Sequence, residues 1–199
     1  MVFKLEPPVR ELVRTLAKDP GIQGVVDLRH FRDSNSGTTR PELIAAIAHA
    51  MGLSDIKLTV EIDAVDLPED IAAYVSKPTL FPRKGSYAYR NTRFHMCLSA
   101  SLSRAPFSTR VYAIAHECAH LVLESIRHPL RESERAVDVT AMVMGFAEYA
   151  TAGASYSTDS HVGPWRSSTG FVQTGYLTLN EIDEAMTLIR HLRASSGVS

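Results

Sequence analysis

The chain has 199 residues, of which 45% are hydrophobic and 22% charged, and its formal net charge at pH 7 is −1. These are the proportions of a globular protein long enough to bury a core, and so small a charge gives no reason to expect nucleic acid or an anionic membrane as a partner. No apolar run approaches the length of about 18 residues that crosses a membrane. The two cysteines, Cys97 and Cys118, do not form a disulfide framework, so we expect a cytoplasmic protein.

The first part of the sequence predicts helices at both ends of a polar stretch, followed by a strand. Apolar residues recur at helical spacing over residues 8–18, and a second helix begins at Pro41 and ends near Gly52. Residues 56–62 alternate between apolar and polar, which is typical of a strand with one buried face. Residues 67–76 are expected to form a short helix with acidic residues in its first turn.

Two more strands are predicted before the central helix. They span residues 86–90 (SYAYR) and 93–102 (RFHMCLSASL), and in the second of them His95 alternates with apolar neighbours and should face away from them. A long helix then begins at Ser108, the candidate N-cap, and ends before the His128-Pro129 pair.

The remaining elements are two helices separated by a loop. The helix after the His128-Pro129 pair should run to about Tyr149 and be apolar over much of its surface. Residues 151–175 are rich in Gly, Ser and Thr and lack periodicity, which predicts a functional loop or lid. A final helix over 179–194 is preceded by a capping box of Thr178 and Glu181. The pattern indicates an α+β fold with a small, mostly antiparallel sheet packed against several helices.

The central helix carries the sequence His116-Glu117-Cys118-Ala119-His120, an H-E-x-x-H pattern. Two histidines four residues apart lie on nearly the same helical face, so both ring nitrogens can bind one Zn²⁺. The glutamate between them can act as the general base for a water that the metal acidifies. We therefore assign His116 and His120 as zinc ligands and Glu117 as the catalytic base.

A catalytic zinc needs a third protein ligand, and the next helix offers Glu134, with Asp138 one turn later. Glu134 would complete a His₂Glu site, and Asp138 would accept the free ring N–H of a ligand histidine, His116. The alternative is an acidic helix face paired with Arg131 or Arg135.

Other third ligands are less consistent with the spacing. Glu124 follows His120 by one turn on the same helix, which points it away from the open side of the metal, and Glu132 faces elsewhere than Glu134. His128 follows His120 by eight residues, and the metzincin pattern fails because positions 123 and 126 are Leu and Ile.

The pair of motifs, H-E-x-x-H followed on the next helix by E-x-x-x-D, resembles the gluzincin metallopeptidases. The short gap between them is similar to that of the ImmA/IrrE-type bacterial metalloproteases, over roughly residues 85–190. The resemblance implies a zincin-like domain that hydrolyses a peptide bond, with one regulatory protein as substrate. The chain departs from that family at Glu124, where a further histidine is frequent, and has no helix-turn-helix pattern near its N-terminus.

Such enzymes need a donor for the oxyanion of the tetrahedral intermediate, and Tyr156 and His161 in the predicted loop are candidates. We divide the chain into an N-terminal helical segment, 1–55, packed on a metalloprotease domain, 56–199. Two alternatives stay open: a zinc hydrolase of a non-peptide amide, and a zinc-binding regulatory or interaction protein without turnover.

Overall fold

A computed structural model of the chain describes residues 6–31, 41–64, 72–78, 80–153, 155–161, 167–173 and 175–198. For the described residues between 152 and 173 it gives the backbone alone. In chain order the elements are α1 (Val9–Leu16), η1 (Ala17–Gly21), η2 (Arg29–Phe31), α2 (Pro41–Ala50), β1 (Lys57–Ala64), β2 (Ala73–Val75), α3 (Tyr87–Asn91), β3 (Arg93–Ser99), α4 (Ala100–Arg104), α5 (Phe107–Ser125), α6 (Glu134–Ala141), η3 (Met142–Phe146), α7 (Ala147–Gly153), β4 (Ser155–His161), β5 (Ser167–Gln173) and α8 (Leu179–Ser196).

The α+β prediction is confirmed, with a small three-stranded sheet in the order β1-β3-β2. The sheet is mixed: β1 runs parallel to β3, and β2 runs antiparallel to β3. On β3 the side chains of Phe94, Met96 and Leu98 are buried and that of His95 is exposed, as the alternation of the sequence predicts. The sheet therefore has one face in the core and one face outside it.

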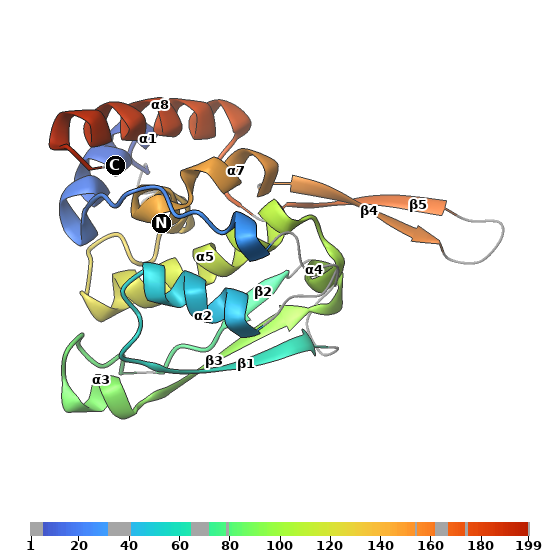
Figure 1. Cartoon of the computed structure of the whole chain (residues 1–199), viewed down its shortest axis with the longest axis horizontal. Helices are drawn as coiled ribbons and strands as arrows, with labels where there is room; N and C mark the ends of the chain where they lie inside the picture. Colours follow the sequence, from blue (N-terminus) through green and yellow to red (C-terminus); the bar gives the residue numbers. More distant parts are fainter. Residues whose placement is uncertain are drawn as a thin grey trace, which may run out of the picture.

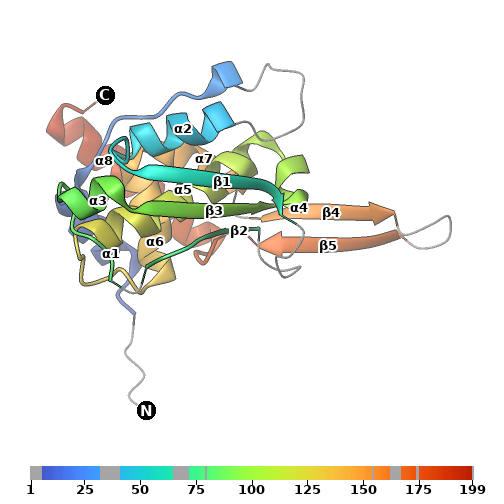
Figure 2. The same ribbon diagram turned by 90° about the horizontal axis from the view of Figure 1, so that it is seen from below.

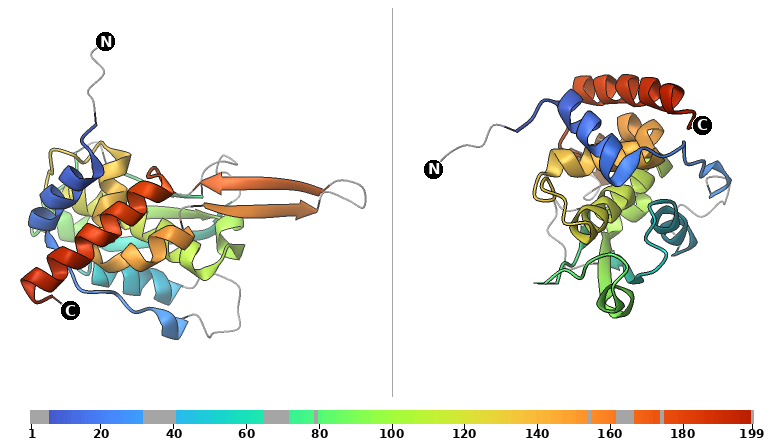
Figure 3. Two further views of the ribbon diagram at one scale, coloured as in Figure 1. Left: turned by 90° about the horizontal axis from the view of Figure 1, so that it is seen from above. Right: turned by 90° about the vertical axis from the view of Figure 1, so that its left-hand side faces the viewer.

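The elements form layers, with α5 in the middle (Figure 1). The sheet and α2 lie on one side of α5, the chain from α6 through η3 to α7 lies on the other, and α1 and α8 form the outermost layer (Figures 1 and 3). Figure 2 views the outer face of the sheet, which no described helix covers. Within the described ranges, no helix is long and apolar enough to cross a membrane.

Helix α5 is buried around nearly its whole circumference, including His116, Glu117 and His120. The apolar residues around the motif form one stripe on a helical projection, with His116 and His120 on roughly the opposite side, so the sequence alone predicts one buried face. The difference arises because α5 is packed on both sides, so its polar face meets α6 rather than open solvent.

Three short segments differ from their predictions, because a few apolar residues do not decide between strand and helix. The predicted strand 93–102 ends at Ser99, which caps the short helix α4. Residues 73–75 of the predicted helix 67–76 form strand β2, and residues 65–71 lie outside the description. The predicted strand 86–90 is instead α3, whose N-cap Ser86 accepts a hydrogen bond from the backbone N–H of Tyr89.

Three further corrections concern the second half of the chain. The N-cap of α5 is Pro106 rather than Ser108, although the helix does end before the His128-Pro129 pair, at Ser125. The single helix expected up to Tyr149 is divided into α6, η3 and α7. Much of the predicted loop 151–175 forms the antiparallel pair β4–β5, which extends away from the body of the molecule (Figure 2). The predicted division into 1–55 and 56–199 stays a prediction.

Gly145 interrupts the chain between α6 and α7, with a φ of 111° that L side chains rarely adopt. Its carbonyl oxygen accepts a hydrogen bond from the N–H of Val26 at 3.1 Å, and the carbonyl of Val143 accepts one from Gln23 at 2.9 Å. The extended segment after η1 therefore hydrogen-bonds to the backbone where the helix is broken. Beyond the break, α7 packs against α5.

Gly145→Ala is expected to destabilise the protein by about 3 kcal/mol or more, which combines the cost of a left-handed alanine with that of overpacking. An added Cβ would lie 2.6 Å from the carbonyl oxygen of Gly24. Gly85→Ala is the matched control, because Gly85 also has a positive φ of 80° but no atom within 4 Å of its Cβ position. Urea denaturation of both variants checks this, and equal losses of stability would contradict the argument from crowding.

Candidate metal centre

Three side chains from two helices converge on one point beside α5. The Nε2 atoms of His116 and His120 each lie 3.3 Å from the same Oε2 atom of Glu134. A metal bound tetrahedrally at about 2.0–2.2 Å by nitrogen and oxygen ligands sets them about 3.3–3.6 Å apart. The three groups together could hold a metal ion.

The local sequence explains how these groups meet. His116 and His120 are one turn apart on α5, and their rings are perpendicular with centroids 5.0 Å apart. Ser133 caps α6 by accepting a hydrogen bond from the N–H of Ala136, so Glu134 is the first residue of that helix. The contact of α6 with α5 brings this first turn over the histidines, and the side chain of Glu134 stays 40% exposed at the rim of the group.

Asp138 lies one turn deeper and is fully buried. Its Oδ1 is 2.8 Å from Nδ1 of His116, and its Oδ2 accepts hydrogen bonds from the backbone N–H groups of Tyr176 at 2.5 Å and Leu177 at 3.1 Å. A carboxylate oxygen beside Nδ1 keeps a proton on that nitrogen, which leaves the Nε2 lone pair of His116 available to a metal. Asp138 thus makes the contact with His116 that the sequence predicted.

The ionisation of the group is set by these contacts. Burial lowers the pKa of His116, but hydrogen bonds to Asp138 and Glu134, together with the charges of Asp138 and Glu117, outweigh it and raise the pKa to about 10. Hydrogen bonds from His116 and His120 hold the pKa of Glu134 far below its ordinary value. Without a metal, a proton therefore occupies the space between imidazole and carboxylate that a cation would take.

We expect metal binding to release a proton at pH 7 and to strengthen as the pH rises. A pKa of about 10 means that His116 keeps its proton through neutral pH, so a metal has to displace it. For one proton released, the apparent affinity rises about tenfold per pH unit up to the pKa. Calorimetric titration in buffers of different ionisation enthalpy measures this directly. No proton release at pH 7 would contradict the charged state of His116.

Glu117 is 8% exposed and lies between the two histidines on α5. Its negative charge contributes to raising the pKa of both His116 and Tyr176. The structure therefore brings His116, His120 and Glu134 together, with Glu117 buried on the same helix as the two histidines.

Tyr176 lies beside the same group and was not anticipated from the sequence. Its ring stacks on that of His116 at a centroid distance of 5.9 Å and an angle of 22°, while 57% of the residue is exposed. Burial and the charges of Glu134, Asp138 and Glu117 raise its pKa. The only signal in the sequence is its place two residues before the capping residue of α8, which does not reveal the return to α6. The side chains of Tyr156 and His161, the predicted oxyanion donors, lie outside the described part of the chain.

The alternative third ligands are engaged elsewhere. Glu124 is paired with Lys77 and with Arg131, at 3.8 and 3.4 Å. Glu132 lies 3.4 Å from Arg131 with its side chain 76% exposed. The Nδ1 atom of His128 accepts a hydrogen bond from a backbone N–H. Lys77 also places its Nζ 3.4 Å from Nδ1 of His120, so a positive charge adjoins that ring.

Asp138→Asn is expected to weaken metal binding by about 10–100-fold, the usual effect of losing an outer partner of a ligand histidine. If the amide oxygen of the new side chain faces His116, its NH₂ group faces the backbone N–H donors of Tyr176 and Leu177, and donor meets donor. If the amide is reversed, its NH₂ donates to Nδ1 of His116, and the ring proton moves to Nε2, the atom that should bind the metal. Competition with a chromophoric chelator measures the affinity. Asp183→Asn, on the exposed face of α8, is the control, and equal affinities for both variants would contradict the role of Asp138.

Comparisons of the chain with protein-family models, with curated proteins and with solved structures gave no match. The chemistry of the centre therefore rests on the geometry of its own residues.

Proposed function

We propose that the protein is a zinc-dependent metallopeptidase. The observation that carries the proposal is the convergence of His116, His120 and Glu134, with the carboxylate of Glu117 on the same helix. Two imidazoles and one carboxylate at tetrahedral separations are the ligands of catalytic zinc sites, and three protein ligands leave a position for water or substrate. The resemblance of the two motifs to ImmA/IrrE-type metalloproteases supports the same assignment.

Zinc in such a site polarises a carbonyl group and lowers the pKa of water to about 7. Glu117 accepts a proton as water attacks the carbonyl carbon, and it delivers that proton to the nitrogen of the leaving amine when the C–N bond breaks. Asp138 holds His116 in the tautomer that the ion requires, and Glu134 would be the third ligand beside the two histidines. Tyr176, stacked on His116, is the described side chain best situated to donate to the oxyanion.

Strand β2 supports a peptide as the substrate. It is an edge of the three-stranded sheet, and in the described part of the chain no further strand pairs with its other side. Ala72 and Ser76 bond to β3, so the backbone groups of Ala73 and Val75 point to the free edge. The strand leads within two residues to Lys77, beside His120. An extended peptide pairing with this edge would pass close to the metal. The resemblance to ImmA/IrrE-type proteases favours one regulatory protein as the natural substrate.

The test is cleavage of a complex mixture of peptides, with new termini identified by mass spectrometry. We expect cleavage by the zinc-loaded protein at a restricted set of sequences, loss of cleavage in excess chelator, and recovery when zinc is returned. Bound zinc with no cleavage of peptides or of folded candidate proteins would overturn the peptidase and favour a zinc-binding protein without turnover. Cleavage of small amides alone would favour a hydrolase of another class.

A further inference from the structure

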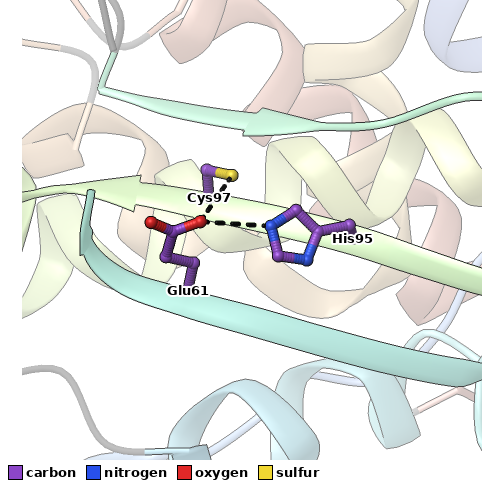
Figure 4. A group of neighbouring side chains, drawn as sticks. All are labelled: Glu61, His95 and Cys97. Atoms are coloured by element: carbon purple, nitrogen blue, oxygen red, sulfur yellow. Dashed lines mark hydrogen bonds and ion pairs between the residues drawn. The ribbon is translucent and has the colours of Figure 1, made fainter. Parts of the chain in front are cut away.

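A second group of metal-ligating side chains lies on the outer face of the sheet, away from the centre on α5. Glu61 projects from β1, and His95 and Cys97 project from β3 toward it (Figure 4). The parallel register sets Glu61 opposite Cys97 and Thr59 opposite His95. The neighbours of His95 on β3, Phe94 and Met96, point into the core instead. The two groups therefore lie on opposite faces of the sheet.

The separations within this group fit the ligand set of a tetrahedral ion. Nε2 of His95 is 3.3 Å from Oε2 of Glu61, and Sγ of Cys97 is 3.7 Å from the same oxygen. Bond lengths of about 2.3 Å to sulfur and 2.0–2.2 Å to nitrogen and oxygen give edges of about 3.3–3.6 Å for N···O and 3.5–3.7 Å for S···O. All three ligand atoms lie within 4.8 Å of one another.

Thr59 sets the tautomer of His95 that a metal needs. The hydroxyl of Thr59 donates to the carbonyl oxygen of Phe94 at 3.1 Å, so its oxygen is left to accept from Nδ1–H of His95 at 3.2 Å. The Nε2 lone pair then faces the carboxylate of Glu61, and two acceptors 3.3 Å apart attract each other only if a proton or a cation lies between them. A ligand histidine usually donates its other ring N–H to an acceptor that fixes its tautomer, and the hydroxyl oxygen of Thr59 is such an acceptor for His95.

We propose that Glu61, His95 and Cys97 form a second metal site, for a divalent ion of the zinc class, with water in the remaining position. Thiolate, imidazole and carboxylate together select such an ion over Mg²⁺ or Ca²⁺, which prefer oxygen alone. Binding breaks the S–H bond of Cys97, releases that proton to solvent and forms one metal–sulfur bond. The ion would join β1 to β3 from outside the core, and it does not depend on the peptidase proposed above.

The surroundings of Cys97 are consistent with an exchangeable site. Burial and the charge of Glu61 raise the pKa of the thiol, so in the metal-free protein its S–H donates to Oε2 of Glu61. The side chains of Glu61 and His95 are 55% and 46% exposed, so an ion can enter from solvent. The other thiol, Cys118, is fully buried on α5 and does not compete.

The experiment is a Co²⁺ titration of tag-free protein in which His116→Ala and His120→Ala have removed the first centre. We expect one Co²⁺ per chain, with the near-ultraviolet absorption of a cobalt–thiolate bond, and its displacement by Zn²⁺. Adding Cys97→Ser should abolish the band, whereas Cys118→Ala should leave it. Absence of the band in folded protein, or its persistence in Cys97→Ser, would overturn the proposal and leave the group as a hydrogen-bonded surface network.

A second measurement uses the wild-type chain, in case the double variant does not fold. One equivalent of Zn²⁺, added after the first centre is filled, should slow the alkylation of Cys97 by at least tenfold. Thr59→Val should weaken that protection, because it removes the hydrogen-bond partner of Nδ1 of His95. Unchanged alkylation of Cys97 at saturating zinc would contradict the site.

Discussion

Replacing Glu117 with glutamine is expected to remove turnover and to leave the metal bound. The amide is nearly isosteric with the carboxylate but cannot accept a proton from water, and general-base catalysis of this kind contributes about 10²–10⁴-fold to the rate. Glu117 is not among the three groups that converge on the metal position, so the ligand set is unchanged. We expect peptide cleavage to fall by that factor, measured as the rate of product formation at saturating zinc.

The matched control is Glu132→Gln, which makes the same chemical change at a carboxylate that is 76% exposed. Its cleavage rate should equal that of the wild-type chain. A Glu117→Gln variant that binds zinc and still cleaves at the wild-type rate would exclude Glu117 as the base. A variant that loses zinc as well would mean that Glu117 supports the metal centre rather than the proton transfer.

Much of the centre follows from local sequence because its key spacings lie within single helices. His116 and His120 are one turn apart, and so are Glu134 and Asp138, so any helix through these residues aligns each pair. The capping box at Thr178 is likewise complete within four residues and is present at the start of α8. What the sequence does not specify is that α6 packs with its first turn over α5, and the family resemblance supplied that expectation.

The features that were missed depend on pairing between distant segments. Tyr176 reaches the centre because its backbone N–H binds Asp138, 38 residues earlier in the chain. His95 was correctly placed on the exposed face of β3, but its proximity to Glu61 depends on the parallel register of β1 with β3. The short elements α3 and β2 were exchanged between helix and strand, because a few alternating residues satisfy both patterns.

His120→Ala is expected to lower zinc affinity by more than about 100-fold, beyond the 10–100-fold effect of losing an outer partner such as Asp138. Two protein ligands would remain, and a tetrahedral zinc site needs three. His120 is a better choice than His116, because removing His116 would take a hydrogen-bond partner from the fully buried carboxylate of Asp138 and could unfold the chain. The Nε2 of His120 contacts the carboxylate of Glu134, whose side chain is 40% exposed to solvent. When His120 is removed, that carboxylate keeps its contact with His116.

Zinc affinity is measured by competition with a chelator in protein that also carries Cys97→Ser, so that a second ion on the sheet does not contribute. His191→Ala is the control, because His191 is an exposed histidine on α8. Circular dichroism should show that the His120→Ala variant is folded, since Glu134 and Asp138 keep their hydrogen bonds to His116. Equal zinc affinity in the two histidine variants would mean that the ion is held elsewhere. The group of His116, His120 and Glu134 would then be an ion-paired cluster without a metal, and the peptidase proposal would fail.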